Sequence, residues 1–410
     1  MIKLYKYKGC LNMVSKEMYK LGSKKSTIRT IFEYGIERAK VVGEENIYDF
    51  SLGNPNVPTP EIVTKTMIDI LQNEDPCSIH GYTVAPGNPE CRKLMAESIN
   101  RRFGTSFEGK NIFFTAGAAA SITICFKALS EKDDEFITFA PYFPEYKCFV
   151  ESTGARLNVV PPDIENFQIN FEEFEKILNK NTKAVIVNSP NNPSGAVYNE
   201  DTIKKLADLL RKKEKEYGHP IFIISDEPYR EIAYDGINVP YLTKYYNNTL
   251  VCYSYSKSLS LAGERIGYIL IPNEVDDYNV LFASIAGAAR VLTHVNAPAF
   301  LQKVVARCAD VPSNIEVYKL NRDLLYNGLI EAGFECVKPD GAFYLFPKAL
   351  EDDEKAFCER AKKYDLLLVP GSDFGCPGYF RASYCISTET IRKSLPAFKK
   401  LAEEYKSEKR

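Results

Sequence analysis

Short apolar runs alternate with amphipathic segments between residues 110 and 271. The runs at 111–116, 135–140, 183–189, 221–225, 248–256 and 265–271 are rich in Val, Ile, Phe and Tyr, which is typical of buried strands. Residues 121–130 and the segment from Asn199 to Gly218 have the spacing of helices. Apolar strands that alternate with helices predict an α/β domain, with a mainly parallel sheet covered by helices on both faces.

The pattern changes after Ser313. A long helix closed by Gly333 is followed by predicted strands at 334–339, 341–347, 366–371 and 379–385, with helices at 356–364 and from Thr388 onward. This mixture predicts a smaller α+β domain. We therefore expect three parts: residues 1–48, an N-terminal extension and a helix around 28–41 that packs on the small domain; a large cofactor-binding domain at 49–305; and a small C-terminal domain at 306–410. Residues 1–12 are expected to be a poorly packed extension.

The overall charge, the cysteines and the histidines argue against several classes of protein. The 410 residues hold 52 Lys and Arg against 54 Asp and Glu, so no broad basic field is present to bind nucleic acid. The eleven cysteines form no C-x-x-C pair and indicate free thiols in a reducing cytoplasm. The three histidines lie far apart, which disfavours a metal site. No apolar run approaches the roughly 18 residues that span a membrane.

Polar residues of particular chemistry follow three of the predicted strands. Asn192 follows the run at 183–189, Asp226 and Tyr229 follow the run at 221–225, and Lys257 follows the run at 248–256. The carboxyl ends of parallel strands meet at one edge of a sheet, so these side chains are expected to converge. A buried aspartate needs a cationic partner to stay ionised, and a desolvated lysine near Arg265 can attack a carbonyl. Together they are the parts of a pyridoxal phosphate site.

Five motifs carry a resemblance to a known family. The run S-Y-S-K-S-L-S-L-A-G-E-R-I-G at 254–267 resembles the cofactor-lysine motif of class I aminotransferases, which belong to the fold type I pyridoxal phosphate enzymes. The runs N-N-P-S-G at 191–195, D-E-P-Y at 226–229, A-P-Y-F-P-E-Y at 140–146 and G-Y-x-x-x-x-G-x-P-E at 81–90 resemble other signatures of that family, in the family's order. The resemblance, to the aspartate aminotransferase-like members, runs from about residue 25 to the C-terminus.

The resemblance implies a role for each residue around the cofactor ring. Lys257 would hold pyridoxal 5'-phosphate as an internal aldimine and then carry the proton of the substrate's α-carbon. Asp226 would pair with the ring nitrogen, and Tyr229 and Asn192 would bond the ring oxygen. Phe143 would stack on the ring. Taken alone, each residue also has a structural interpretation, such as a helix cap for Asp226 or a surface position for Lys257.

The resemblance also implies the residues around the phosphate. Arg265, Ser254 and the backbone amides of the turn at 117–119 (Gly117, Ala118, Ala119) would bind it. Tyr82 would reach the phosphate of a neighbouring subunit, so a homodimer with shared active sites is expected. The sequence departs from the family's pattern in two places: alanines stand where the turn often has a hydroxyl residue or a lysine, and Glu264 stands where an aromatic residue is common.

For the substrate, the resemblance implies that Arg381 clamps the α-carboxylate, with Asn192 beside it, and that Gly53 closes over the substrate through its backbone. Arg29 and Arg290 are candidates for binding a distal carboxylate, although each is readily explained as structural. We expect an aminotransferase that moves the amino group of an L-amino acid, aspartate-like or other, to a 2-oxo acid. The alternative is a carbon-sulfur lyase or other α-carbon chemistry on the same scaffold.

Overall fold

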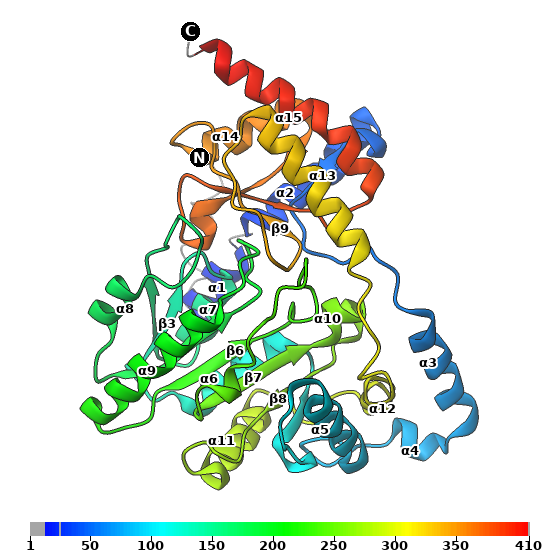
Figure 1. Ribbon diagram of the computed structural model, residues 1–410. Coiled ribbons are helices and arrows are strands. Elements are labelled where there is room, and N and C mark those ends of the chain that lie inside the picture. The colour runs from blue at the N-terminus through cyan, green and yellow to red at the C-terminus, as the bar shows by residue number, and fades with distance from the viewer. Residues whose placement is uncertain (1–12, 24–25, 409–410) are drawn as a thin grey trace.

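The computed structural model describes residues 13–23 and 26–408, so the predicted extension at 1–12 lies outside the described residues. In Figure 1 the lower part of the molecule is a large sheet flanked by helices, and the upper part is a smaller group of helices and short strands. The helices of the N-terminal third are α1 (Lys16–Ser23), α2 (Thr27–Val42), α3 (Glu61–Asn73), α4 (Pro76–His80) and α5 (Pro89–Phe103).

A seven-stranded sheet forms the body of the large domain. Its order is β2-β8-β7-β6-β5-β3-β4, and only β8 runs antiparallel to its neighbours. This confirms the predicted mainly parallel sheet. The strands are β2 (Ile112–Thr115), β3 (Glu135–Phe139), β4 (Arg156–Val160), β5 (Thr182–Asn188), β6 (Phe222–Asp226), β7 (Thr249–Ser254) and β8 (Gly267–Leu270).

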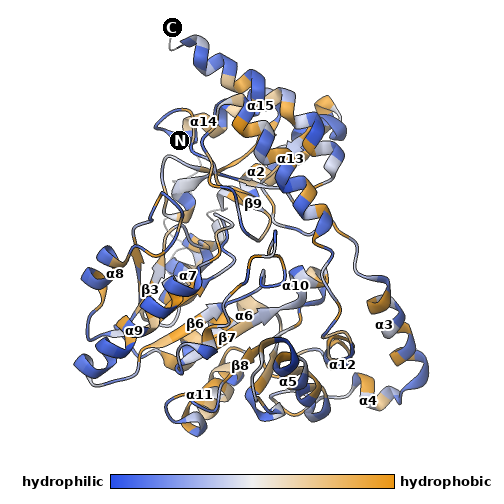
Figure 2. Cartoon of the chain, viewed as in Figure 1, coloured by the Kyte–Doolittle hydropathy of each residue, from blue (hydrophilic) through white to orange (hydrophobic). Residues whose placement is uncertain are grey.

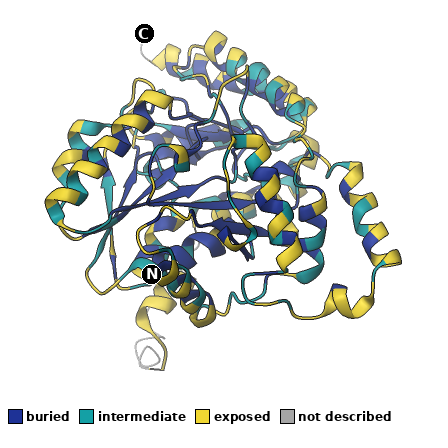
Figure 3. Cartoon of the chain, turned by 60° about the horizontal axis from the view of Figure 1, so that its bottom comes forward, coloured by how far each residue is buried: buried dark blue, intermediate teal, exposed yellow. Residues whose placement is uncertain are grey.

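Helices cover both faces of this sheet because its strands are apolar on both sides. Along β5, Ala184 and Ile186 pack in one cluster with α6 (Ala118–Leu129), α7 (Glu145–Glu151) and α11 (Tyr278–Val291). Val185 and Val187 pack on the opposite face with α8 (Phe171–Ile177) and α9 (Glu200–Tyr217). In Figure 2 the strands are mostly orange or pale while α9 is largely blue, and Figure 3 shows buried strands between helices with exposed outer faces.

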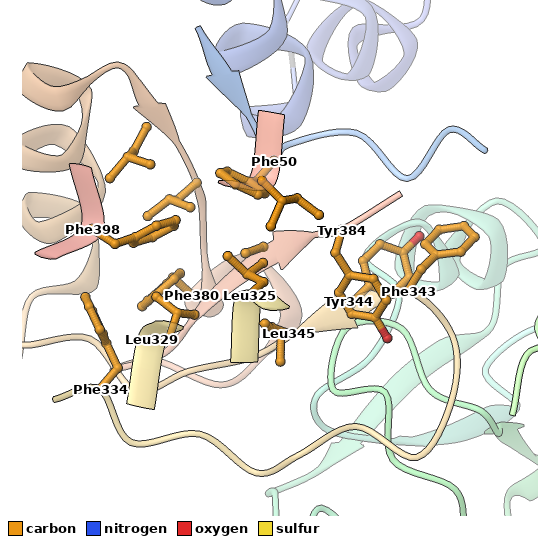
Figure 4. Packing of buried hydrophobic residues seen from close by; sticks show 14 of the residues in the cluster. Phe50, Leu325, Leu329, Phe334, Phe343, Tyr344, Leu345, Phe380, Tyr384 and Phe398 are labelled. Carbon is orange, nitrogen blue, oxygen red and sulfur yellow. The ribbon is translucent and has the colours of Figure 1, made fainter. Parts of the chain in front are cut away.

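The small domain is built on α13 (Glu316–Ala332), α14 (Glu354–Ala361) and α15 (Thr388–Glu408) around short strands. Strands β11 (Val369–Pro370), β12 (Phe380–Ser383) and β9 (Tyr344–Leu345) form an antiparallel sheet, and β10 (Leu366–Leu367) pairs with β1 (Tyr48–Asp49). Figure 4 shows its core, where Leu325, Leu329, Phe380 and Phe398 meet Phe50 from the N-terminal segment. Arg38 of α2 donates to Asp365 at 2.8 Å, so α2 lies against this domain. The boundaries at 48/49 and 305/306 stay predictions.

Some predicted elements were wrong. Residues 334–339 form no strand, because the Phe334 amide donates to the Leu329 carbonyl at the end of α13. The predicted strand at 366–371 divides between two partners, with β10 on β1 and β11 on β12. Arg265 precedes β8 in a left-handed conformation, with φ 53°, instead of opening the strand. Strand β4 was missed, since its run R-L-N-V-V is short and half polar.

Candidate active site

A cavity of about 300 Å³ lies where the carboxyl ends of β5, β6 and β7 face the small domain. It brings together eleven residues predicted from the sequence: Gly53, Ala118, Ala119, Phe143, Asn192, Asp226, Tyr229, Ser254, Lys257, Arg265 and Arg381. Seven further residues complete its wall: Ile28, Ile122, Asn188, Pro228, Ser256, Ala262 and Tyr344. The convergence follows from topology, since the ends of parallel strands meet at one edge of the sheet.

Lys257 lies in α10 (Tyr255–Ser258), one turn of helix directly after β7. The Ser254 side chain caps this turn by accepting from the Ser256 amide, which directs Lys257 into the cavity. Its Nζ donates to the Gly53 carbonyl at 2.6 Å. The pKa of Lys257 is lowered to about 8. Burial is the main cause, Cys385 raises the pKa, and the positive charges of Arg381 and Arg265 lower it. About a tenth of this amine is therefore uncharged at pH 7, far more than for an ordinary lysine, and the uncharged form is the nucleophile.

Asp226 is the last residue of β6 and is buried. Its Oδ2 accepts a hydrogen bond of 2.5 Å from the Tyr146 hydroxyl. The pKa of Asp226 is raised to about 7. Burial is the main cause, the Tyr146 hydrogen bond opposes it, and the charge of Glu227 adds to it. Its Oδ1 is buried and has no hydrogen-bond partner among the described residues. A protonated ring nitrogen fits this vacant acceptor, because it would supply both the missing donor and the missing positive charge.

Three predicted ring contacts line the middle of the cavity. The hydroxyl of Tyr229 lies 2.8 Å from the hydroxyl of Tyr344, and Asn192 Oδ1 accepts from Arg381 Nη1 at 3.1 Å. The Phe143 ring stands edge to face with the Tyr146 ring, with centroids 5.5 Å apart. A flat aromatic group between these side chains would have an apolar face on one side and polar partners at its rim.

The opposite end of the cavity suits a phosphate. Arg265 Nη1 donates to the Ser256 hydroxyl at 3.3 Å and to the Ala262 carbonyl at 3.0 Å. Gly117 caps α6 with φ 87°, and a Cβ atom there would lie 2.8 Å from Arg265 Nη2. The first amides of a helix have no intrahelical acceptor and lie at the positive end of its dipole. A guanidinium, serine hydroxyls and a helix N-terminus thus meet in one place, as phosphate binding requires.

Arg381 of β12 forms the small-domain side of the cavity and is buried. Its Nη2 donates to the Ser51 carbonyl at 2.5 Å, and its Nε has no hydrogen-bond partner in the described part of the chain. Its hydrogen bonds within the described residues go to neutral groups, the Asn192 side-chain oxygen and the Ser51 carbonyl, and burial lowers its pKa. A buried guanidinium with an unused donor is suited to a carboxylate that arrives with a substrate.

Other predicted residues lie outside the cavity. Gly117 borders it through Arg265 but does not line it. The Tyr82 side chain is 98% exposed and does not line the cavity of its own chain. Arg29 pairs with Glu33 on the surface of α2, and Arg290 is exposed on α11. Neither arginine reaches the cavity of this chain, which disfavours both as distal carboxylate ligands within the chain.

Sequence reasoning missed several residues of the site. Tyr146 ends the run A-P-Y-F-P-E-Y and Ser256 precedes the lysine in its motif, so both stood inside signatures that pointed to the site. Tyr344 stood in the predicted strand at 341–347, where its register could not be read. Ile28 lines the cavity from the first turn of α2. These two come from parts of the chain that only the tertiary fold brings to the sheet edge.

Within the described residues, none of the helices is long and apolar enough to span a membrane, and no cluster of three or more His, Cys, Asp or Glu side chains is placed to hold a metal ion. The ten cysteines placed in the structure are all free thiols.

Comparisons with known proteins agree with this geometry. The family "Aminotransferase class I and II" matches residues 45–398. An aspartate aminotransferase of Thermotoga maritima is 30% identical over 366 residues, covering 87% of this chain and 92% of the relative. Aromatic-amino-acid aminotransferase 2 of Thermococcus litoralis is 28% identical over 391 residues, 93% of this chain and 96% of the relative. An aminotransferase structure from Eubacterium rectale has a TM-score of 0.94 and 57% identity, covering 96% of this chain and 99% of that one. The chain belongs to the class I and II aminotransferases, enzymes that use pyridoxal phosphate.

Proposed function

We propose that this protein transfers the amino group of an L-amino acid to a 2-oxo acid, with pyridoxal 5'-phosphate bound at Lys257. One observation carries the proposal: a single cavity holds a desolvated lysine, an aspartate oxygen with no hydrogen-bond partner and a buried arginine with an unused donor. These are respectively suited to a carbonyl, a protonated ring nitrogen and a carboxylate.

When bound, the cofactor supplies an electron sink for the substrate's α-carbon. The residues of the chain hold and orient the reactants. Asp226 keeps the proton on the ring nitrogen, and Tyr146 holds that carboxylate in place. Tyr229 and Asn192 would bond the ring oxygen, and Phe143 would pack on the ring. The Lys257 amine would take the proton of the substrate's α-carbon, a role that its lowered pKa favours near neutral pH.

The two ends of the cavity fix the orientation. Arg265, Ser254 and the N-terminus of α6 bind the phosphate, and Ser256 adds a second hydroxyl. Arg381 binds the α-carboxylate of the substrate, beside Asn192. The Gly53 backbone closes over the bound substrate. With its carboxylate at Arg381 and the cofactor phosphate at Arg265, a substrate would present its α-carbon to Lys257, which lines the same cavity.

The donor is proposed only as an L-amino acid. Relatives are named for aspartate and for aromatic amino acids, so the family does not decide between them. The homodimer with Tyr82 contributed across the interface, a cytoplasmic location and a role in amino acid biosynthesis remain our proposals. The free thiols support the location, and the exposure of Tyr82 supports the dimer.

Substitution of Lys257 tests the proposed function. Lys257→Ala should abolish transfer between an amino acid and a 2-oxo acid, whereas Lys204→Ala, on the exposed face of α9, should leave it unchanged. Borohydride treatment of the wild-type protein should fix the cofactor to one peptide that contains Lys257. Label on another lysine would contradict the assignment. Steady release of pyruvate and ammonia without an acceptor would instead support the carbon-sulfur lyase.

A further inference from the structure

Tyr344 is the one small-domain tyrosine that lines the cavity among the described residues. It lies in β9 and is 2% exposed. Figure 4 shows it beside Phe343 at the end of the small-domain cluster that faces the large domain. Its side chain therefore packs in the small-domain core and also contacts residues of the candidate active site, and three of those contacts bear on its role.

The first contact joins Tyr344 to the ring-oxygen tyrosine. The hydroxyls of Tyr344 and Tyr229 lie 2.8 Å apart, and either can donate. A phenol has one proton to donate. If Tyr229 donates its proton to the ring oxygen of the cofactor, the bond between the two tyrosines can persist only with Tyr344 as the donor. The direction of this hydrogen bond thus depends on what occupies the cavity.

The second contact joins Tyr344 to the carboxylate site. The Arg381 guanidinium lies over the Tyr344 ring, 4.8 Å from its centroid. The positive charge of Arg381 lowers the pKa of Tyr344 and also that of Tyr229. Burial is the larger effect on both tyrosines and raises their pKa values. A carboxylate that neutralises Arg381 would remove the lowering effect on both phenols.

The third contact joins Tyr344 to the loop that holds the lysine. A Cβ atom on Gly53 would lie 2.1 Å from the Tyr344 hydroxyl oxygen, so that hydroxyl occupies the space a side chain at position 53 would need. The carbonyl of the same Gly53 accepts from Lys257 Nζ. The hydroxyl of Tyr344 thus lies beside the backbone that holds Lys257 and the phenol of Tyr229, while its ring lies under the guanidinium of Arg381.

We propose that Tyr344 is a positioning residue that transmits occupancy of the Arg381 carboxylate site to Tyr229, and through it to the cofactor ring oxygen. This inference rests on the proposed function. Tyr344 itself touches Arg381 and Tyr229 and acts through them. When a carboxylate binds Arg381, the Tyr344 hydroxyl becomes a weaker acid and so a weaker donor to Tyr229. Tyr229 in turn donates a weaker hydrogen bond to the ring oxygen, in addition to the direct effect of the Arg381 charge on Tyr229.

The test is a pH titration of the visible absorbance of the bound cofactor. Wild-type holoenzyme is titrated alone and with a saturating carboxylic acid that lacks an amino group, and the two midpoints are compared. In the wild type, binding of the carboxylic acid should move the pH midpoint of the cofactor absorbance. In Tyr344→Phe this shift of the midpoint should be smaller by roughly half or more, while the affinity for the carboxylic acid changes less than about threefold. Turnover should show a lower kcat with a nearly unchanged KM.

Two further variants make the test specific. Tyr384→Phe removes another buried small-domain hydroxyl, which bonds the Ala342 carbonyl outside the cavity, and should keep the wild-type shift. In a Tyr229→Phe background, Tyr344→Phe should cause no further change, because its route is already broken. A full shift in Tyr344→Phe, or independent additive effects of the two substitutions, would overturn the inference. If the wild-type protein showed no visible absorbance from bound cofactor, the proposed function would be overturned together with the role of Tyr344. The other outcomes bear on Tyr344 alone.

Discussion

At the scale of single residues, Asp226 and Lys257 are shifted in opposite directions by the same cause. Burial raises the pKa of the aspartate to about 7 and lowers the pKa of the lysine to about 8. Each shift favours the uncharged form, because the protein supplies no opposite charge to either group at close range. An ion pair between the two would have removed both shifts. Because Asp226 and Lys257 do not pair with each other, Asp226 stays available for the ring nitrogen of the cofactor and Lys257 for its carbonyl group.

The raised pKa of Asp226 makes the cofactor-free protein less stable as the pH rises. An aspartate ionises near pH 4 in the unfolded chain and near pH 7 when folded. The folded state is therefore penalised as the pH passes from about 4 to about 7. At pH 8, cofactor-free Asp226→Asn should be more stable than the wild type by about 3 to 4 kcal/mol, and near pH 4 the difference should vanish. Urea unfolding at both pH values measures this.

With the cofactor bound, the wild type should be more stable than Asp226→Asn at pH 8, because a protonated ring nitrogen stabilises the aspartate and not the asparagine. Asp352→Asn, at an exposed position of the small domain, is the matched control and should change neither state. Equal stability of the wild type and Asp226→Asn at pH 8 without cofactor would contradict the burial argument. A holoenzyme in which Asp226→Asn is still the more stable form would contradict the pairing with the ring.

At the scale of elements, strand ends were the most predictable feature. Asn192, Asp226 and Lys257 each followed an apolar run, and the parallel sheet brought them to one cavity. Short strands were less predictable, since the strand expected around Cys336 is absent and β4 was missed. The run of β4 holds an arginine and an asparagine among its five residues, so its apolar signal is weak. Tyr344 could not be assigned to the site, because its place depends on how the small domain packs against the sheet.

The turn into α6 carries a prediction for phosphate binding. Gly117 has φ 87°, and an added Cβ atom would lie 2.8 Å from Arg265 Nη2. Gly117→Ala would strain the turn and displace the guanidinium. We expect a loss of pyridoxal phosphate affinity of about tenfold or more, equivalent to roughly 1.4 kcal/mol. Binding of pyridoxal, which has no phosphate, should change much less. Equilibrium dialysis with each compound measures the difference.

Gly263→Ala is the control for that prediction. This glycine lies two residues before Arg265, and a Cβ atom there would have no neighbour within 4 Å. Its substitution should leave the affinity for both compounds at the wild-type level. If Gly117→Ala weakened pyridoxal and pyridoxal phosphate equally, the α6 turn would have a structural role and no specific part in holding the phosphate.

At the scale of the whole molecule, one side of the large domain carries apolar side chains that the described residues leave exposed. Figure 1 shows α3 and α4 extending along this side. Ile62, Ile68 and Leu71 of α3 are about half exposed, and Tyr82 and Val84 follow α4 with 98% and 57% exposure. Exposed apolar groups gathered in one segment favour a protein interface. A second copy of the chain would cover them in a two-fold dimer.

A hybrid dimer tests whether Tyr82 acts across that interface. Lys257→Ala and Tyr82→Ala are each first shown to be weakly active, and the two chains are then mixed under conditions that exchange subunits. If each Tyr82 completes the site of the partner, the hybrid has one doubly damaged site and one intact site. If Tyr82 acts within its own chain, both sites carry a lesion. Its exposure within the chain favours the first arrangement. We therefore expect recovery towards half of the wild-type activity per hybrid, and no recovery in proven hybrids would show that the site is not shared through Tyr82.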